Sequence, residues 1–125
     1  MKRVLLAATA LALSASITPT LAQDPTKVDA NHYKVEFEND QVRVLRVKYG
    51  VKEKSVMHEH PDAVAIFLTD GMVKFGTPDG KFVDSPVKAG TPRWTPAGKH
   101  LPENIGDKPF EVLLVEMKAK PAAKK

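Results

Sequence analysis

The sequence lacks cysteine altogether, and this absence narrows the chemistry that its 125 residues can perform. Without cysteine there are no disulfide bonds, zinc–thiolate sites, iron–sulfur clusters or cysteine nucleophiles. Any metal ion must therefore be held by nitrogen and oxygen atoms. The length suits one ordinary domain and excludes a two-domain enzyme. The 42% hydrophobic and 27% charged content is typical of a globular protein, and not of a disordered or polytopic membrane protein.

The longest apolar run lies near the N-terminus and is too short to cross a membrane. Lys2–Arg3 forms a basic start, Val4–Ala15 is almost entirely apolar, and Thr20–Ala22 places small residues at the −3 and −1 positions of a cleavage site. This order is typical of a secretory signal peptide. The run falls short of the roughly 20 residues that a membrane span needs, and Pro19 argues against the alternative of an uncleaved anchor. We expect residues 1–22 to be removed on export, which leaves a periplasmic or secreted protein without a membrane span.

Aromatic residues are scarce, at 6%, and are not interleaved with the basic residues. Without the two cations of residues 1–22, the formal net charge falls from +4 to +2, which is 17 Lys and Arg minus 15 Asp and Glu. Much of this excess lies in Lys118–Lys125, a segment typical of a solvated tail. Because the rest is close to neutral, we expect no nucleic-acid partner. A contact between the tail and an acidic membrane surface is the alternative for this segment.

The middle of the chain is punctuated by turn residues in the manner of a small all-β domain. Short runs rich in β-branched residues are separated by turns such as Asn39–Asp40 and Thr77–Gly80. No segment predicts a helix of ten or more residues. Because about eight short strands must close into a barrel or sandwich, we expect a small jelly-roll β-barrel over residues 31–118. A loose linker at 23–30 would precede it, and a basic tail at 119–125 would follow. The predicted strands are 32–38, 42–49, 63–69, 72–76, 81–83, 93–95 and 110–117.

The sharpest candidate site is Met57–Pro61, which contains two histidines two residues apart. Residues i and i+2 of a strand point to the same face, so His58 and His60 present their imidazoles side by side while Glu59 points away. Histidine is the commonest neutral nitrogen ligand of transition metals. The pair alone is also typical of an exposed surface pair, because a metal site needs further donors.

A third histidine strengthens the metal interpretation. His100 follows the turn Pro96–Lys99, at the start of a segment that would return antiparallel beside the others. We therefore expect a barrel to bring His58, His60 and His100 together as the metal ligands. The fourth histidine, His32, lies at the edge of the predicted domain and is interpreted as a surface residue.

Glycines and histidines recur at fixed spacings in residues 50–104. The first pattern is Gly50, seven residues, His58-Glu59-His60, ten residues and Gly71. The second is Gly90, five residues, Pro96-Ala97-Gly98-Lys99-His100, three residues and Asn104. Together they resemble the two motifs of the cupin family, although the first has two extra residues after its glycine and the second lacks one before its histidine. The resemblance is strongest to small, exported, single-domain cupins, and it implies a jelly-roll barrel with a metal ion held by the motif histidines.

The chain departs from the usual cupin ligands at one position. Counting back from Gly71, the glutamate of the first motif falls on Val64, which cannot coordinate a metal ion. The resemblance therefore implies a three-histidine face made by His58, His60 and His100, as in some iron cupins. Such a face leaves positions open for substrate and water, and without a carboxylate the metal keeps more positive charge, which favours an anionic substrate. The alternative is a barrel whose site is weak or lost.

Two other carboxylates are candidates to replace the missing glutamate. Asp62 has the same parity as His60 if the strand stays regular, although Pro61 can break the register. Glu103 follows His100 by three residues and is expected near the mouth of the cavity.

The other candidate residues have simpler interpretations. Trp94 is interpreted as a core residue, with a place in the cavity wall as the alternative. Three arginines are interpreted as surface residues, with carboxylate binding as the alternative. These are Arg43, Arg46 and Arg93. Phe67, Phe75 and Phe110 are expected to pack in the core.

These observations favour a metal-binding cupin of the periplasm, with iron as the first divalent metal and manganese, nickel or zinc as alternatives. If the protein is an enzyme, we rank an oxygen-dependent oxidation of a small polar or acidic molecule first. An open three-histidine face can accept both dioxygen and a chelating substrate. The competing interpretation is a non-catalytic module that binds a small ligand or a metal, and a third is a structural role with relict histidines. Small cupins often pair through a sheet edge, so we expect a homodimer.

Overall fold

The structure is a computed structural model that describes residues 23–119. The expected signal peptide, residues 1–22, and residues 120–125 of the expected tail lie outside the described residues. Within residues 23–119, every helix is too short or too polar to cross a membrane.

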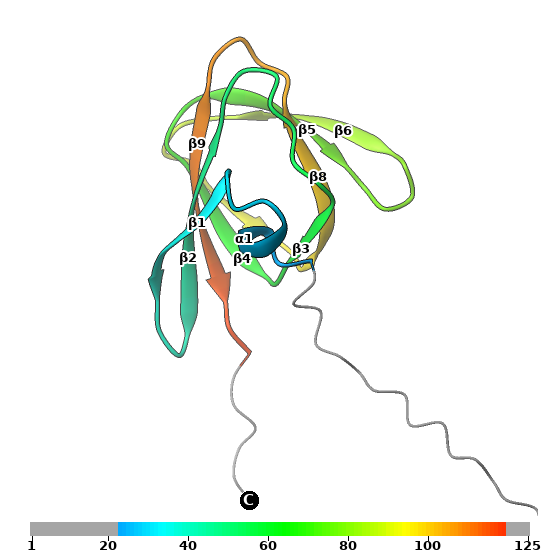
Figure 1. Cartoon of the computed structure of the whole chain (residues 1–125). Coiled ribbons are helices and arrows are strands. Elements are labelled where there is room, and N and C mark those ends of the chain that lie inside the picture. Colours follow the sequence, from blue (N-terminus) through cyan, green and yellow to red (C-terminus); the bar gives the residue numbers. More distant parts are fainter. Residues whose placement is uncertain (1–22, 120–125) are drawn as a thin grey trace, which may run out of the picture.

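The described residues form two antiparallel sheets that face one another (Figure 1). The five-stranded sheet has the order β1 (Tyr33–Glu38), β2 (Val42–Tyr49), β9 (Phe110–Met117), β4 (Ala63–Phe67) and β7 (Pro92–Thr95). The four-stranded sheet has the order β3 (His58–His60), β8 (Gly98–Asn104), β5 (Gly71–Gly76) and β6 (Phe82–Val87). Neighbouring strands in these sheets are often distant in sequence, as expected for a jelly roll. The predicted all-β jelly-roll class is confirmed, although the two sheets stay separate and do not join into one closed ring.

The core lies between the two sheets because the strands alternate buried and more exposed residues. In β9, Phe110, Val112 and Leu114 are buried, and the residues between them are only half-buried. Leu45 on the adjoining strand β2 is completely buried. The expected packing of Phe67 and Phe110 in the core is confirmed. Phe75 is only partly buried and packs against this core.

The predicted strand bounds match the observed ones best in segments where β-branched residues alternate with other residues and no proline occurs. The bounds of β2 and β9 match the predicted ranges 42–49 and 110–117. Strand β6 is longer than the predicted 81–83, because it continues through Pro86, which the sequence placed in a connector. Since β6 is an edge strand, the missing N–H of Pro86 leaves the sheet's hydrogen-bond ladder intact.

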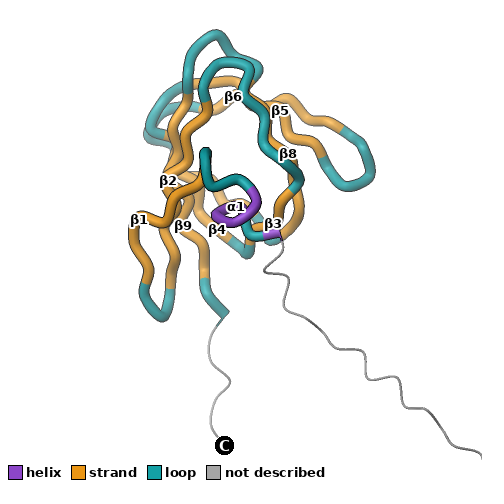
Figure 2. Tube along the Cα trace, viewed as in Figure 1, coloured by secondary structure: helices purple, strands orange, loops and turns teal. Residues whose placement is uncertain are grey.

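The stretch expected to be a loose linker, residues 23–30, contains the one-turn helix α1 (Pro25–Val28). The Asp24 side chain caps this turn by accepting a hydrogen bond from the Thr26 backbone N–H at 2.9 Å, and Pro25 occupies the first turn, where its missing N–H costs nothing. This turn contacts β1 and β3 across one end of the molecule (Figures 1 and 2). The expectation of a loose segment is therefore corrected: these residues are held against the two sheets.

Candidate metal centre

The three histidines that the sequence singled out lie together on the inner face of the four-stranded sheet. Strands β3 and β8 pair so that His58 lies directly opposite His100, and His60 is two residues further along the same face of β3. One nitrogen of each ring lies within 4.8 Å of the others, and the Nε2 atoms of His58 and His100 are 3.0 Å apart. His58 and His60 are buried, and His100 is half-buried. The arrangement therefore gathers three imidazoles at one point of the interior.

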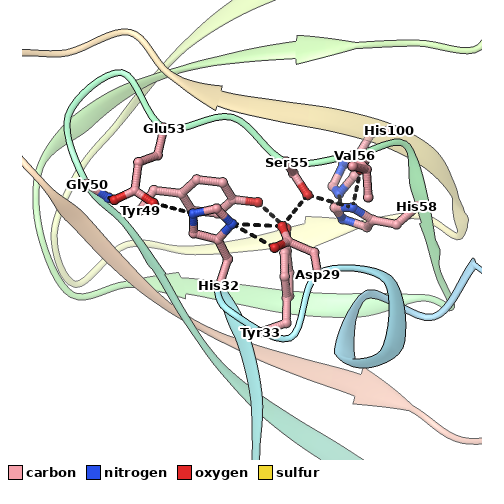
Figure 3. Close-up of polar contacts among 10 residues, drawn as sticks. All are labelled: Asp29, His32, Tyr33, Tyr49, Gly50, Glu53, Ser55, Val56, His58 and His100. Carbon is pink, nitrogen blue, oxygen red and sulfur yellow. Dashed lines mark hydrogen bonds and ion pairs between the residues drawn. The ribbon is translucent and has the colours of Figure 1, made fainter.

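The His58 ring is fixed by hydrogen bonds on the side away from the other histidines. Its Nδ1 donates to the backbone oxygen of Val56 at 2.8 Å and contacts Ser55 Oγ at 3.2 Å. Ser55 Oγ in turn donates to Asp29 Oδ2 at 2.6 Å, next to α1 (Figure 3). Because Nδ1 carries the proton, the lone pair of His58 is on Nε2, the atom that faces His100.

The His60 ring is fixed in the same sense by a buried carboxylate. Its Nδ1 donates to Glu116 Oε2 at 2.6 Å. Its Nε2 is buried and has no hydrogen-bond partner among the described residues. A buried polar atom without a partner is costly unless a ligand satisfies it. The unpartnered lone pair, beside two other imidazoles, is what a metal ion with nitrogen ligands would fit.

Glu116 is the residue of the candidate site that the sequence reasoning missed. It occupies the next inward position of β9 after Phe110, Val112 and Leu114, and it is 2% exposed. A glutamate at the inward parity of an apolar strand is a signal that the sequence does contain. Alternation can therefore place Glu116 inside, although it does not say which histidine the carboxylate meets.

Arg43 neutralises the Glu116 carboxylate. Its Nε donates to Glu116 Oε1 at 2.7 Å, and its Nη1 donates to Asp24 Oδ2 at 2.7 Å. The interpretation of Arg43 as a surface residue is wrong, because the guanidinium lies between these two carboxylates and is mostly buried. A continuous series of side-chain contacts therefore runs from Asp24, the cap of α1, through Arg43 and Glu116. It ends at His60, a metal-ligand candidate. Arg46, by contrast, lies on the outer face and pairs with Glu36 and Glu111, as expected.

Burial keeps two of the three rings neutral. It lowers the pKa of His58 to about 4, with a further contribution from the neighbouring His60. It lowers the pKa of His100 to about 3, again with contributions from His60 and His58. Desolvation disfavours the charged imidazolium, so both rings are neutral at neutral pH and each has one nitrogen without a proton. This is the protonation state that metal ligation requires.

None of the carboxylates that the sequence offered as substitutes lies at this point. Asp62 Oδ1 accepts a hydrogen bond from the Ala97 backbone N–H at 2.7 Å and so holds the turn before β8. Glu103 is an odd number of residues from His100 on β8 and faces the other side of the sheet. Val64 is on β4, in the opposite sheet, and adds no ligand atom. The candidate ligands are therefore three imidazoles, with Glu116 behind one of them.

A cavity of about 290 Å³ adjoins the histidines. His60 and His100 form part of its wall, and most of the remaining lining is apolar or aromatic. Trp94 also borders the cavity, but it pairs with Val64 on the side of β4 away from the buried Ala65 and is 57% exposed, so the interpretation of Trp94 as a core residue is wrong. Arg93 is exposed as expected, yet it too lines the cavity. The histidines thus face a space of the size that a small molecule needs.

His32 is not the surface residue that was expected. Its side chain is 12% exposed, and its ring stacks on Tyr49 with centroids 4.3 Å apart. Its Nδ1 donates to the Asp29 carboxylate, and its Nε2 donates to Glu53 (Figure 3). Burial acts to lower the pKa of His32, but the hydrogen bonds to Glu53 and Asp29 outweigh it and raise the pKa. His32 therefore supports Asp29, which in turn holds Ser55.

A His32→Gln variant should be destabilised mainly in acid solution. Because the pKa of His32 is raised on folding, its contribution to stability is fully present below the unfolded pKa of about 6.5 and is lost as the pH rises through the folded pKa. We expect urea denaturation with chelator present to show a loss of about 1 kcal/mol or less at pH 5.5, since solvent screens Glu53, and a smaller loss at pH 8.5. Lys34→Gln, on the exposed face of β1, is the control. An equal loss at both pH values would contradict this account.

No family model matches the chain, and no curated protein matches it. Solved structures do match. A cupin domain from Bordetella pertussis Tohama I is 28% identical, with 70% of this chain and 92% of that chain covered and a TM-score of 0.65. An RmlC-like cupin family protein with a double-stranded β-helix fold from Methanocaldococcus jannaschii is 21% identical, with 73% and 84% covered and a TM-score of 0.55. A protein from Bacillus halodurans is 19% identical over 90% of this chain and 89% of that chain, with a TM-score of 0.57. The last two show likeness of fold alone.

Proposed function

Because this chain belongs to the cupin superfamily, we propose that His58, His60 and His100 hold one divalent transition metal ion at the wall of the cavity. The observation that carries the proposal is the buried Nε2 of His60, which has no partner among the described residues and lies beside the nitrogens of the other two rings. Three imidazole ligands suit iron, manganese, nickel or zinc, and we favour iron.

In each candidate ligand, a neighbouring residue fixes either the ring nitrogen that does not bind the ion or the plane of the ring. Glu116 accepts the Nδ1 proton of His60, and Val56 and Ser55 hold the Nδ1 of His58, so both rings keep Nε2 for the ion. The His100 ring stacks on Phe75 with centroids 5.3 Å apart, which fixes its plane. When bound, the metal supplies Lewis acidity and, if it is iron, redox chemistry.

The proposed function is the binding of a small molecule next to this ion, with oxygen-dependent oxidation as the reaction if the metal is iron. The support is the position of His60 and His100 in the cavity wall, which places the metal-binding nitrogens within reach of a bound molecule. We also propose export to the periplasm or the exterior on the sequence of residues 1–22 alone. Homodimerisation stays a prediction from the family resemblance.

One observation favours a second candidate, a binding module without turnover. Within residues 23–119, no carboxylate lines the cavity, and its titratable side chains are the two histidines, two tyrosines and Arg93. The hydroxyl of Tyr33 is already paired with that of Tyr49 at 2.8 Å, and burial raises the pKa of both. The cavity therefore offers few groups for acid–base catalysis.

Elemental analysis tests the proposal. The protein, purified without a polyhistidine tag, should contain about one divalent metal per chain, either as isolated or after reconstitution with iron, manganese, nickel or zinc. No metal after reconstitution with all four would overturn the proposal. Oxygen uptake with a panel of small organic acids then separates the two candidates, because only the enzyme consumes oxygen in a way that depends on both metal and substrate.

A further inference from the structure

We infer that the cavity takes a small molecule with an apolar body and one carboxylate, and that Arg93 binds this carboxylate at the mouth. The inference rests on the proposed function, because the molecule occupies the cavity that the metal would face. It names the class of ligand and the residue that selects it. Three features support it: the apolar lining, the position of Arg93 and the absence of a carboxylate partner for Arg93 among the described residues.

The lining of the cavity suits an apolar body of about one ring. Apart from the histidines, its inner wall is formed by aliphatic and aromatic side chains, among them Phe67, Phe75 and Phe110. A volume of about 290 Å³ corresponds to roughly ten water molecules. A fully polar ligand would have to give up its hydration here without gaining hydrogen-bond partners. An apolar body, by contrast, gains contact with the wall and releases water.

Arg93 is placed where it can contact the polar end of such a ligand. It lies opposite Ala65 in the pairing of β7 with β4, so its side chain shares the inner face with that buried residue. Its Nη1 donates to Ser85 Oγ at 3.0 Å, and its Nη2 donates to the Pro86 backbone oxygen at 3.4 Å. Both acceptors belong to β6, in the other sheet. The guanidinium therefore spans the edges of the two sheets beside the cavity.

The guanidinium of Arg93 lacks a counter-ion within residues 23–119. Arg43 and Arg46 each pair with two carboxylates, whereas Arg93 donates to a hydroxyl and a carbonyl. A carboxylate would be a stronger acceptor than either, because it carries a full negative charge and can accept two parallel N–H bonds from the planar guanidinium. The part of the chain that the structure describes places no carboxylate in the cavity wall, so none of these lining residues repels an anion. A carboxylate is thus the ligand group that complements this site best.

Trp94 provides a built-in reporter for the test, because it is the only tryptophan in the chain, borders the cavity and directly follows Arg93 on β7. Three probes, compared by fluorescence titration, test the ring and the carboxylate of the inferred ligand one at a time. Benzoate has both the ring and the carboxylate, benzamide keeps the ring without the charge, and acetate keeps the charge without the ring. We expect saturable binding of benzoate, with benzamide and acetate each weaker by about 10-fold or more.

Arg93 variants complete the experiment on the full chain. Arg93→Gln should weaken benzoate by about 10-fold or more and leave benzamide unchanged, and Arg93→Lys should lie between. Arg46→Gln, the same substitution on the outer face, is the control and should bind benzoate like the unaltered protein. Equal affinity for benzoate and benzamide, or an unchanged benzoate affinity in Arg93→Gln, would overturn the inference.

Metal content, measured on the same samples, keeps the two proposals apart. Arg93-dependent benzoate binding by a protein that takes up no metal would support the ligand class and refute the metal site. One metal per chain without any preference for benzoate would support the metal site and refute the ligand class.

Discussion

Replacing His60 with alanine should abolish metal binding at stoichiometric metal concentrations, with a loss of affinity of about 100-fold or more. The variant removes the buried ligand nitrogen of His60, which has no partner within residues 23–119, and two imidazoles then have to hold the ion alone. The variant also leaves Glu116 without its imidazole partner, although Arg43 still neutralises that carboxylate. We therefore expect the protein to fold and to lose the metal.

Competition with a chromophoric chelator measures this change, and circular dichroism confirms that the variant is folded. His58→Ala and His100→Ala should show losses of the same order, because each removes one of three ligands. Glu59→Ala is the matched control, since Glu59 lies between His58 and His60 on β3 but faces the other side of the strand. A His60→Ala protein that kept one tightly bound metal would place the ion elsewhere.

Replacing Glu116 should lower both stability and metal affinity. Glu116→Ala leaves the Arg43 guanidinium and the His60 Nδ1–H without their buried acceptor, and removing one member of a buried pair costs about 3–5 kcal/mol. Glu116→Gln keeps the shape and one acceptor oxygen, so we expect it to fold with a smaller loss. Its metal affinity should still fall about 10- to 100-fold, as is usual when an outer partner of a metal-binding histidine is removed.

Urea denaturation and chelator competition measure the two effects separately. Glu111→Gln is the control, because Glu111 lies on the same strand but is half-buried on the outer face and pairs with Arg46. We expect it to change stability by less than about 1 kcal/mol and to leave the metal affinity alone. If Glu116→Gln bound metal as tightly as the unaltered protein, Glu116 would have only a structural role.

The sequence predicted the parts of the fold that depend on local pattern. Alternation in 42–49 and 110–117 places two strands with their observed bounds, and the spacing of His58 and His60 puts both rings on one face. Turn residues before His100 indicate that this segment returns beside the first pair. Strand alternation and turns are determined by residues that are close together in the chain, so the local sequence is enough to predict them.

Contacts between segments that are far apart in sequence could not be predicted from local pattern. The alternation of β9 marks Glu116 as inward-facing, but the contact with His60 requires β9 and β3 to face each other from different sheets. The Asp24–Pro25 pair is a readable helix start, yet nothing in it predicts that Asp24 holds Arg43. The exposure of Trp94 at the cavity likewise follows from where β7 lies at the edge of its sheet. Such long-range placement is decided by the assembled sheets.

The most direct test of the metal site is a crystal structure of the reconstituted protein, with diffraction data collected on both sides of the absorption edge of the added metal. The account predicts a single strong anomalous peak among the three histidines, about 2.0–2.3 Å from one nitrogen each of His58, His60 and His100. The Nδ1 atoms of His58 and His60 should keep their bonds to Val56 and Glu116. A fully reconstituted crystal with no peak there, or with its peak on other residues, would contradict the account.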